Sequence, residues 1–310
     1  MKQSKGLETS SVHHRTATVG GHEIFYREAG PADAPAIVLL HGFPTSSFMF
    51  RDLIPLLSDK YHVIAPDHLG FGHSDAPRAD AFTYTFDALA DLTAGLLDQL
   101  GVDRYALYVQ DYGAPIGWRL ALRNPEHVTA VVTQNGNGYE EGFVESFWKD
   151  VWAYGDAPGP DTEPAVRAAL SVDAVRWQYL HGVSDPSLVS PDTWEHDVAL
   201  LSREGNDRIQ LALFRDYRSN RPLYPRLHAY LRDSGVPVLA VWGRNDEIFA
   251  PAGARAFARD AEDAEVHLID GGHFLLESRL DVVAGYLRGF LGRVLGQETS
   301  GGRPRALTAG

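Results

Sequence analysis

The sequence predicts an α/β fold in which a mostly parallel, eight-stranded sheet is flanked by helices and carries a helical insertion. Three observations lead to this prediction. Short apolar runs of strand length alternate with longer helical patterns along the chain. The runs are apolar at successive positions, as strands are when both faces of a sheet are buried. One long interval, residues 138–230, breaks the alternation and holds no convincing strand.

Eight runs have the length and the Val, Leu or Ile content of strands. The first two are joined at Gly20-Gly21, a pair that favours the tight turn of an antiparallel hairpin. The later runs are separated mostly by helical patterns, which predicts parallel pairing. The expected strands are His13–Val19, His22–Arg27, Ala36–Leu40, His62–Ala65, Arg104–Val109, Val128–Thr133, Pro237–Trp242 and Glu265–Ile269.

Helical periodicity follows or precedes most of these strands, and the connecting helices are expected to cover both faces of the sheet. The expected helices are Ser46–Leu57, Tyr84–Leu100, Tyr112–Arg123, Ala252–Arg259 and Phe274–Leu295.

The insertion is rich in aromatic residues, with four of the six Trp and six of the thirteen Tyr. We predict that it forms a helical cap over the carboxyl ends of the strands; a separate helical domain with its own core is the alternative. The predicted division is therefore a core of residues 12–137 and 231–295, a cap of residues 138–230, and flexible tails at 1–11 and 296–310.

Composition excludes several classes of protein. The 28 Lys+Arg against 41 Asp+Glu give a formal charge of −13, which disfavours nucleic-acid binding. The absence of cysteine excludes disulfides, thiolate metal sites and a cysteine nucleophile. Apolar runs fall far short of the ~20 residues that span a bilayer, and the amino-terminal segment lacks the apolar stretch of a secretion signal. We expect a cytoplasmic protein, monomeric or homodimeric, that binds neither membrane nor nucleic acid.

The strongest local feature is a strand that runs directly into a helix through Gln110-Asp111-Tyr112-Gly113. Small residues at such a turn expose the apical side chain at the top of the sheet, beside the amino terminus of a helix. Asp111 occupies the apex. Two interpretations remain open at this point: a nucleophile at the apex, or an aspartate that caps the helix.

Three further features share the same edge of the predicted sheet. His41-Gly-Phe43-Pro follows one strand, where the amide of Phe43 can form an oxyanion hole with that of Tyr112. Asp246 follows the strand Pro237–Trp242, and His273 follows Glu265–Ile269. The chain order is nucleophile, acid and histidine, each at the carboxyl end of a strand. This order favours a catalytic set of Asp111, Asp246 and His273.

With these residues the chain resembles the α/β-hydrolase superfamily, in the aspartate-nucleophile branch that contains epoxide hydrolases and haloalkane dehalogenases. The resemblance covers about residues 12 to 295. It includes Asp67-His-Leu-Gly70-Phe-Gly72-His-Ser74, which is similar to the loop after the fourth strand in that family. It implies the α/β-hydrolase fold with a helical cap.

An aspartate nucleophile has a chemical consequence that a serine lacks. A carboxylate is already ionised at neutral pH and can displace a leaving group from saturated carbon, forming an alkyl-enzyme ester. His273, oriented by Asp246, would then deprotonate a water that attacks the ester carbonyl, and the amides of Phe43 and Tyr112 would stabilise the oxyanion. The substrates are a small apolar organic molecule and water, with no cofactor and no metal.

The leaving group decides between the two activities. An epoxide leaves as an alkoxide and needs a proton, whereas a halide needs N–H donors. Haloalkane dehalogenases generally have Trp after the nucleophile, where this chain has Tyr112. The segment Phe214-Arg-Asp-Tyr217-Arg resembles the epoxide-hydrolase segment with a ring-opening tyrosine, which implies that role for Tyr217. Tyr154, and less favoured Tyr179, are candidates for a second such tyrosine.

Two tryptophans keep the other activity open. Trp148 and Trp152 could donate to a halide from the cap, or they could be core anchors of the insertion. The leading hypothesis is an epoxide hydrolase, followed by a haloalkane dehalogenase. A ligand-binding protein on a hydrolase scaffold without catalysis is the alternative from another class, and esterase chemistry is disfavoured because the apex is not Ser.

Overall fold

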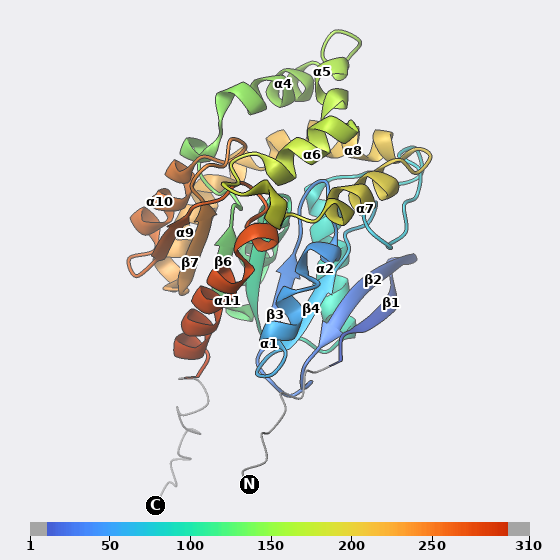
Figure 1. The fold of residues 1–310 in the computed structure, drawn as a ribbon. Helices are drawn as coiled ribbons and strands as arrows, with labels where there is room; N and C mark the ends of the chain where they lie inside the picture. Colours follow the sequence, from blue (N-terminus) through green and yellow to red (C-terminus); the bar gives the residue numbers. More distant parts are fainter. Residues whose placement is uncertain (1–10, 297–310) are drawn as a thin grey trace, which may run out of the picture.

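The computed structural model describes residues 11–296 and contains a single eight-stranded sheet (Figure 1). The predicted tails lie almost wholly outside these residues. All eight predicted strands are confirmed, with ends that differ by at most two residues. They are β1 (His13–Val19), β2 (His22–Ala29), β3 (Ala36–Leu40), β4 (His62–Pro66), β5 (Tyr105–Gln110), β6 (Val128–Gln134), β7 (Val238–Gly243) and β8 (Glu265–Ile269).

The strand order β1-β2-β4-β3-β5-β6-β7-β8 brings the later strands side by side in one direction. β1 and β2 form the predicted antiparallel hairpin, whose turn uses positive φ angles at Gly20 and Gly21. β2 pairs with β4 antiparallel, and all other pairs are parallel. Because Gln110 lies opposite Gln134, the carboxyl ends of β5 and β6 stand at one edge. The loops that follow the parallel strands therefore meet there.

Helices cover both faces of the sheet, as predicted. Buried side chains of α2, α3 and α10 pack on one face, and those of α1 and α11 pack on the other. Alternation along each strand separates the two cores: Val38 and Leu107 face the first group, whereas Ile37 and Ala106 face the second. The helices are α1 (Leu53–Leu57), α2 (Phe86–Gln99), α3 (Gly113–Arg123), α10 (Pro251–Asp260) and α11 (Leu275–Val294).

The prediction of one helix over Ser46–Leu57 is wrong. The segment divides into a 3-10 turn, Ser47–Phe50, and the short α1. The hydroxyl of Ser46 accepts a hydrogen bond from the amide of Phe48 and begins the turn. Pro55 lies inside α1 and has no amide hydrogen to donate to the carbonyl of Arg51, so a continuous helix is interrupted at Arg51-Asp52, before α1.

The insertion between β6 and β7 is helical, and the described residues between those strands include no β-strand assignment. Figure 1 shows α4 to α8 beyond the carboxyl edge of the sheet. The inserted helices are α4 (Glu145–Asp156), α5 (Glu163–Arg167), α6 (Val172–Leu180), α7 (Pro191–Leu201), α8 (Asn206–Asp216) and α9 (Tyr224–Ser234). The predicted boundary at residue 230 falls inside α9, which packs against the core helices α3 and α10. We therefore place the end of the cap before α9.

Among helices of the described residues, none has both the length and the apolar character needed to span a membrane.

Candidate active site

Asp111 stands at the apex of a sharp turn between β5 and α3. Its φ of 46° lies in the left-handed region, which a non-glycine residue adopts at a cost in backbone strain. Two glycines permit the turn. A Cβ on Gly113 would lie 2.0 Å from the carbonyl oxygen of Leu40, and one on Gly42 would lie 2.3 Å from the Cβ of Asp111. Only 5% of Asp111 is exposed, so its carboxylate is held in a dry, rigid position.

The carboxylate of Asp111 lies in the amide pair that the sequence predicts. The amide of Phe43 donates to Oδ1 of Asp111 at 2.6 Å, and the amide of Tyr112 also hydrogen-bonds the carboxylate. The N-cap position of α3 is Tyr112, one residue after Asp111. Asp111 is thus held by the loop after β3, which an ordinary helix cap would not require.

A second loop fixes the position of the loop that carries Phe43. Asp67 accepts hydrogen bonds from the amides of Ser47 and His73, both at 2.7 Å. The amide of His68 donates to Nε2 of His41 at 3.0 Å. Burial lowers the pKa of both histidines, that of His68 to about 4, so both rings are neutral at pH 7. These contacts give the Asp67 loop and His41 a structural role.

His273 joins the other two members of the predicted set. Its Nδ1 lies 2.8 Å from Oδ2 of Asp246, and its Nε2 lies 4.0 Å from Oδ2 of Asp111. Oδ1 of Asp246 accepts the amides of Ile248 at 2.7 Å and Phe249 at 3.2 Å. Because Asp246 is fully hydrogen-bonded, it can orient the ring and stabilise its protonated form.

Two amide side chains that the sequence reasoning missed complete this arrangement. Asn135, with a φ of 50°, donates to Oδ2 of Asp246 at 2.6 Å. Nε2 of Gln110 lies 2.8 Å from Nε2 of His273. Both residues stand at the ends of apolar strands, where a polar side chain is the signal that could have found them.

The pKa values of Asp111 and His273 are both raised above their usual values. Burial raises the pKa of Asp111 to about 6, although His273 and the amides of Phe43 and Tyr112 oppose that change. Burial acts to lower the pKa of His273, but the carboxylates of Asp246 and Asp111 outweigh it and hold the pKa above its usual value. The carboxylate of Asp111 therefore raises the pKa of His273, and His273 in turn lowers the pKa of Asp111.

Tyr217 lies in an aromatic layer above the carboxylate. It is fully buried, with its ring 4.3 Å from that of Trp148 and 5.6 Å from that of Tyr112. Within the described residues its hydroxyl has no hydrogen-bond partner. Burial, followed by Tyr224 and Asp111, raises the pKa of Tyr217 well above its usual value. The hydroxyl is therefore a neutral donor at any physiological pH.

The other predicted tyrosines do not join this layer. Tyr154 lines an outer cavity of the insertion with Glu163 and Arg215. The hydroxyl of Tyr179 donates to Asp197, and its ring stacks on Phe274 at 4.0 Å. Tyr154 is buried in the same apolar cluster as Tyr217, but the ring contacts of Tyr217 among the described residues do not include it, so the role of Tyr154 as a second donor stays a prediction. Tyr224, which the sequence reasoning missed, is the tyrosine that most affects the pKa of Tyr217.

The two tryptophans of α4 do face Tyr217, but they differ in what their indoles do. Nε1 of Trp148 donates to the carbonyl of Ile248 at 2.8 Å and is therefore occupied. Trp152 stacks on Trp148, with ring centroids 5.1 Å apart, and lies 6.0 Å from Tyr217. Trp148 anchors the insertion to the loop after β7, and the role of Trp152 as a pocket residue stays a prediction.

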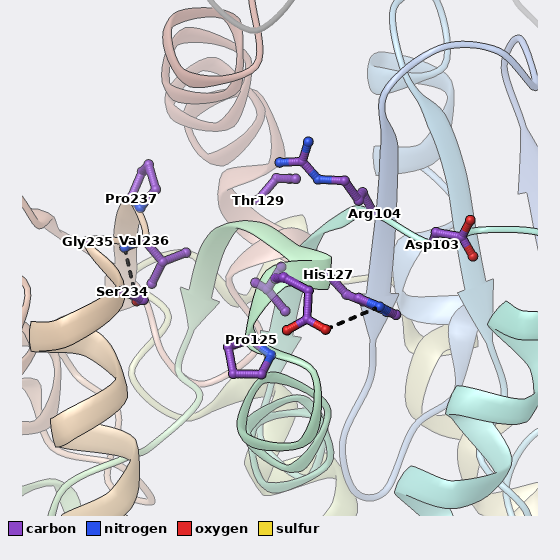
Figure 2. A pocket seen from close by; sticks show the side chains of 11 residues that line it. Asp103, Arg104, Pro125, His127, Thr129, Ser234, Gly235, Val236 and Pro237 are labelled. Carbon is purple, nitrogen blue, oxygen red and sulfur yellow. Dashed lines mark hydrogen bonds and ion pairs between the residues drawn. The ribbon is translucent and has the colours of Figure 1, made fainter.

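A hollow at the opposite edge of the sheet is not part of this site. Figure 2 shows that it is lined by residues such as Arg104, His127 and Pro237. These residues lie at the amino ends of β5, β6 and β7. The catalytic set stands at the carboxyl ends of the parallel strands, where a parallel sheet usually binds its ligands.

Comparisons with known proteins agree with this fold. The family model for the alpha/beta hydrolase fold matches residues 35–280. An uncharacterised hydrolase of Saccharomyces cerevisiae is 43% identical over 274 residues, covering 87% of this chain and 94% of that protein. A haloalkane dehalogenase of Bradyrhizobium diazoefficiens is 29% identical, covering 93% and 96%. The solved structure of the epoxide hydrolase CorEH superimposes with a TM-score of 0.74 at 22% identity, covering 91% and 99%.

Proposed function

Because this chain belongs to the alpha/beta hydrolase family and is a hydrolase related to haloalkane dehalogenases and epoxide hydrolases, we propose that it hydrolyses a small apolar epoxide to a diol through Asp111. The reaction has two steps, formation of an alkyl-enzyme ester and its hydrolysis.

In the first step, Oδ2 of Asp111 attacks a ring carbon of the epoxide. Oδ1 is already hydrogen-bonded to the Phe43 amide, which leaves Oδ2 as the nucleophile. The carbon–oxygen bond of the ring breaks, and the oxygen takes the proton of the Tyr217 hydroxyl. The products of this step are an ester on Asp111 and a tyrosinate at Tyr217.

In the second step, a water gives its proton to Nε2 of His273 and its oxygen bonds to Cγ of the Asp111 ester. The ester carbonyl oxygen stays in the amide pair and becomes the oxyanion. Collapse expels the product alkoxide, which takes the proton from His273. The new carboxylic acid of Asp111 returns its proton to the Tyr217 oxygen, so the enzyme is restored.

Esterification prepares the histidine for its role. The Asp111 charge is one of the two that raise the pKa of His273. An ester carries no charge, so this contribution disappears when the first step is complete. The pKa of His273 then falls, which favours the neutral ring at the moment a base is needed.

The observation that carries the epoxide assignment is the buried, unpartnered hydroxyl of Tyr217, which lies near enough to Asp111 for that carboxylate to raise its pKa. A proton donor suits an alkoxide leaving group better than a halide. In addition, the indole of Trp148 is occupied by Ile248, and Tyr112 stands where dehalogenases have Trp.

A haloalkane dehalogenase is the second candidate, supported by the 29% identity to the Bradyrhizobium diazoefficiens enzyme and by Trp152 on the inner face of α4. The alternative of a non-catalytic binding protein is disfavoured by the complete set of Asp111, Asp246 and His273.

The test is a parallel assay with a styrene-oxide-type epoxide and a bromoalkane. We expect diol formation without halide release. Halide release without diol would overturn the assignment in favour of a dehalogenase, and tight binding of both compounds without turnover would favour the binding protein.

A further inference from the structure

Gln110 is the residue before Asp111 in β5, and it lies beneath the catalytic histidine. Side chains alternate along the strand, so Gln110 points to the same face as Ala106 and Tyr108. That face packs against α11, which begins at Leu275, two residues after His273. The alternation of β5 therefore sends Asp111 and Gln110 to two different parts of one active site.

The contact between Gln110 and His273 has an unusual feature. The two atoms 2.8 Å apart are both nitrogens, Nε2 of the amide and Nε2 of the ring. Nδ1 of His273 faces the Asp246 carboxylate and carries a proton in either state of the ring. In the neutral ring, Nε2 then carries a lone pair and accepts a hydrogen bond from the N–H of the amide. With the amide in this orientation, the contact suits a neutral imidazole.

The other end of the amide has nothing to bond to in this state. Gln110 is fully buried, and within the described residues its Oε1 has no hydrogen-bond partner. A buried, unpaired carbonyl costs free energy and calls for an explanation. Oε1 is an acceptor, and an acceptor beside Nε2 is what a protonated His273 requires.

The surroundings leave Gln110 as the nearest group for this task. The charged groups facing His273 are Asp246, bonded to Nδ1, and Asp111, 4.0 Å from Nε2. Phe249 and Phe274 contact the ring and offer no acceptor. Gln134 donates to the carbonyl of His273 at 3.0 Å and fixes the backbone, not the ring. Once Asp111 is an ester, its charge no longer attracts the imidazolium.

We propose that Gln110 is a positioning residue for water activation: its amide donates to neutral His273 and, after a half-turn, accepts from the imidazolium through Oε1. This proposal rests on the proposed function, because the imidazolium is formed when His273 takes the proton of the hydrolytic water. Water must replace the amide at Nε2 before the transfer, and Oε1 then receives the new N–H. The same side chain thus holds the ring in both protonation states.

The test replaces Gln110 by glutamate, a charged acceptor, and by methionine, which forms no strong hydrogen bond. Gln110→Glu favours the imidazolium and should raise the midpoint of His273 by about one pH unit or more. Gln110→Met should slow ester hydrolysis about tenfold and leave formation of the ester within about twofold. If Gln110→Met folds poorly, Gln110→Asn takes its place. Its amide is too short to reach the ring, so the same slowing of ester hydrolysis is expected.

The matched controls are Gln210→Glu and Gln210→Met. Gln210 lies on α8, is equally buried and also has an unpaired Oε1, but it bonds to Asn206 instead of the histidine. The His273 midpoint is read by NMR of histidine-labelled protein, with its signal assigned from its loss in His273→Asn. This measurement needs no substrate.

The two readouts separate the two claims. A wild-type enzyme that converts neither epoxide nor bromoalkane refutes the proposed function, while the NMR midpoints still decide the role of Gln110. A rise of the His273 titration midpoint in Gln110→Glu that is absent in Gln210→Glu supports the proposal. Ester hydrolysis by Gln110→Glu that is restored by raising the pH supports it as well. Equal midpoints in the two Glu variants would overturn it.

Discussion

The backbone amide of Phe43 donates a hydrogen bond of 2.6 Å to Oδ1 of Asp111. In a serine hydrolase such an amide waits for an oxyanion that forms during reaction; here it already binds one oxygen of the nucleophile. The contact divides the carboxylate into an oxygen that stays and an oxygen that attacks. It also explains how one amide pair can serve both steps, since the same oxygen carries the charge in each.

The stability of the protein should increase when the nucleophile is neutralised. A pKa of about 6 in the folded protein, against 3.8 as the usual value, means that ionisation of Asp111 opposes folding. The penalty is absent below pH 4 and complete above pH 6. Asp111→Asn should therefore stabilise the protein at pH 7 by up to about 3 kcal/mol and abolish activity.

Chemical denaturation at pH 7 and at pH 4 checks this expectation. The gain should shrink at pH 4, where the wild-type carboxyl is protonated. Asp98→Asn, at an exposed position, is the control and should change stability by less than about 0.5 kcal/mol. A gain of equal size at both pH values would contradict the burial of an ionised carboxylate.

The tyrosine above the carboxylate should matter for one leaving group. Tyr217→Phe removes the proton donor and should slow ester formation from an epoxide about 100-fold or more. Tyr154→Phe, a matched substitution of a buried tyrosine that has no ring contact with Tyr217, should leave this rate within about twofold. Single-turnover measurements on both variants would contradict the account if the two rates fell together or if neither fell.

The pH dependence of the first step should report the nucleophile. Asp111 attacks only when ionised, so ester formation should fall about tenfold per pH unit below about pH 6. In His273→Ala the limb should move to higher pH, because His273 lowers the pKa of Asp111. Rapid-mixing kinetics between pH 4.5 and 8 gives both limbs, and a rate that stays level down to pH 4.5 is incompatible with a raised pKa.

Substitution of the two tryptophans should distinguish a residue that anchors the insertion, Trp148, from one that contacts the substrate, Trp152. Trp148→Phe removes the indole donor to the carbonyl of Ile248, which then keeps only the 3.4 Å contact with the amide of Val144, and should cost about 1–3 kcal/mol of stability. Trp152→Phe should cost less and should change KM more than stability. Thermal unfolding and steady-state kinetics of the two variants test this division, which fails if Trp152→Phe is the more destabilising.

Much of the site was predictable because it depends on where strands end. Asp111, Asp246 and His273 each follow a strand of the parallel part of the sheet, and parallel strands bring such positions to one edge. The amides of Phe43 and Tyr112 belong to the same turns. These relations need only strand boundaries and direction, which apolar runs indicate well.

Other features depend on the phase of a helix or on the third dimension. Tyr154 and Trp148 lie on the same helix, and only packing decides which faces the site. Pro55 divides a helical pattern, and α9 crosses the predicted end of the cap. Gln110 reads as one more strand residue until His273, far along the chain, is placed 2.8 Å from it.

The most direct test of the aspartate mechanism is the intact mass of His273→Ala after incubation with an epoxide. Without its base, the variant should form the ester and fail to hydrolyse it, so the protein gains the mass of one substrate molecule. Peptide mapping should assign the added mass to Asp111, and the double variant with Asp111→Asn should gain none. An adduct on any other residue, or no adduct with a substrate that the wild-type enzyme converts, would contradict the mechanism.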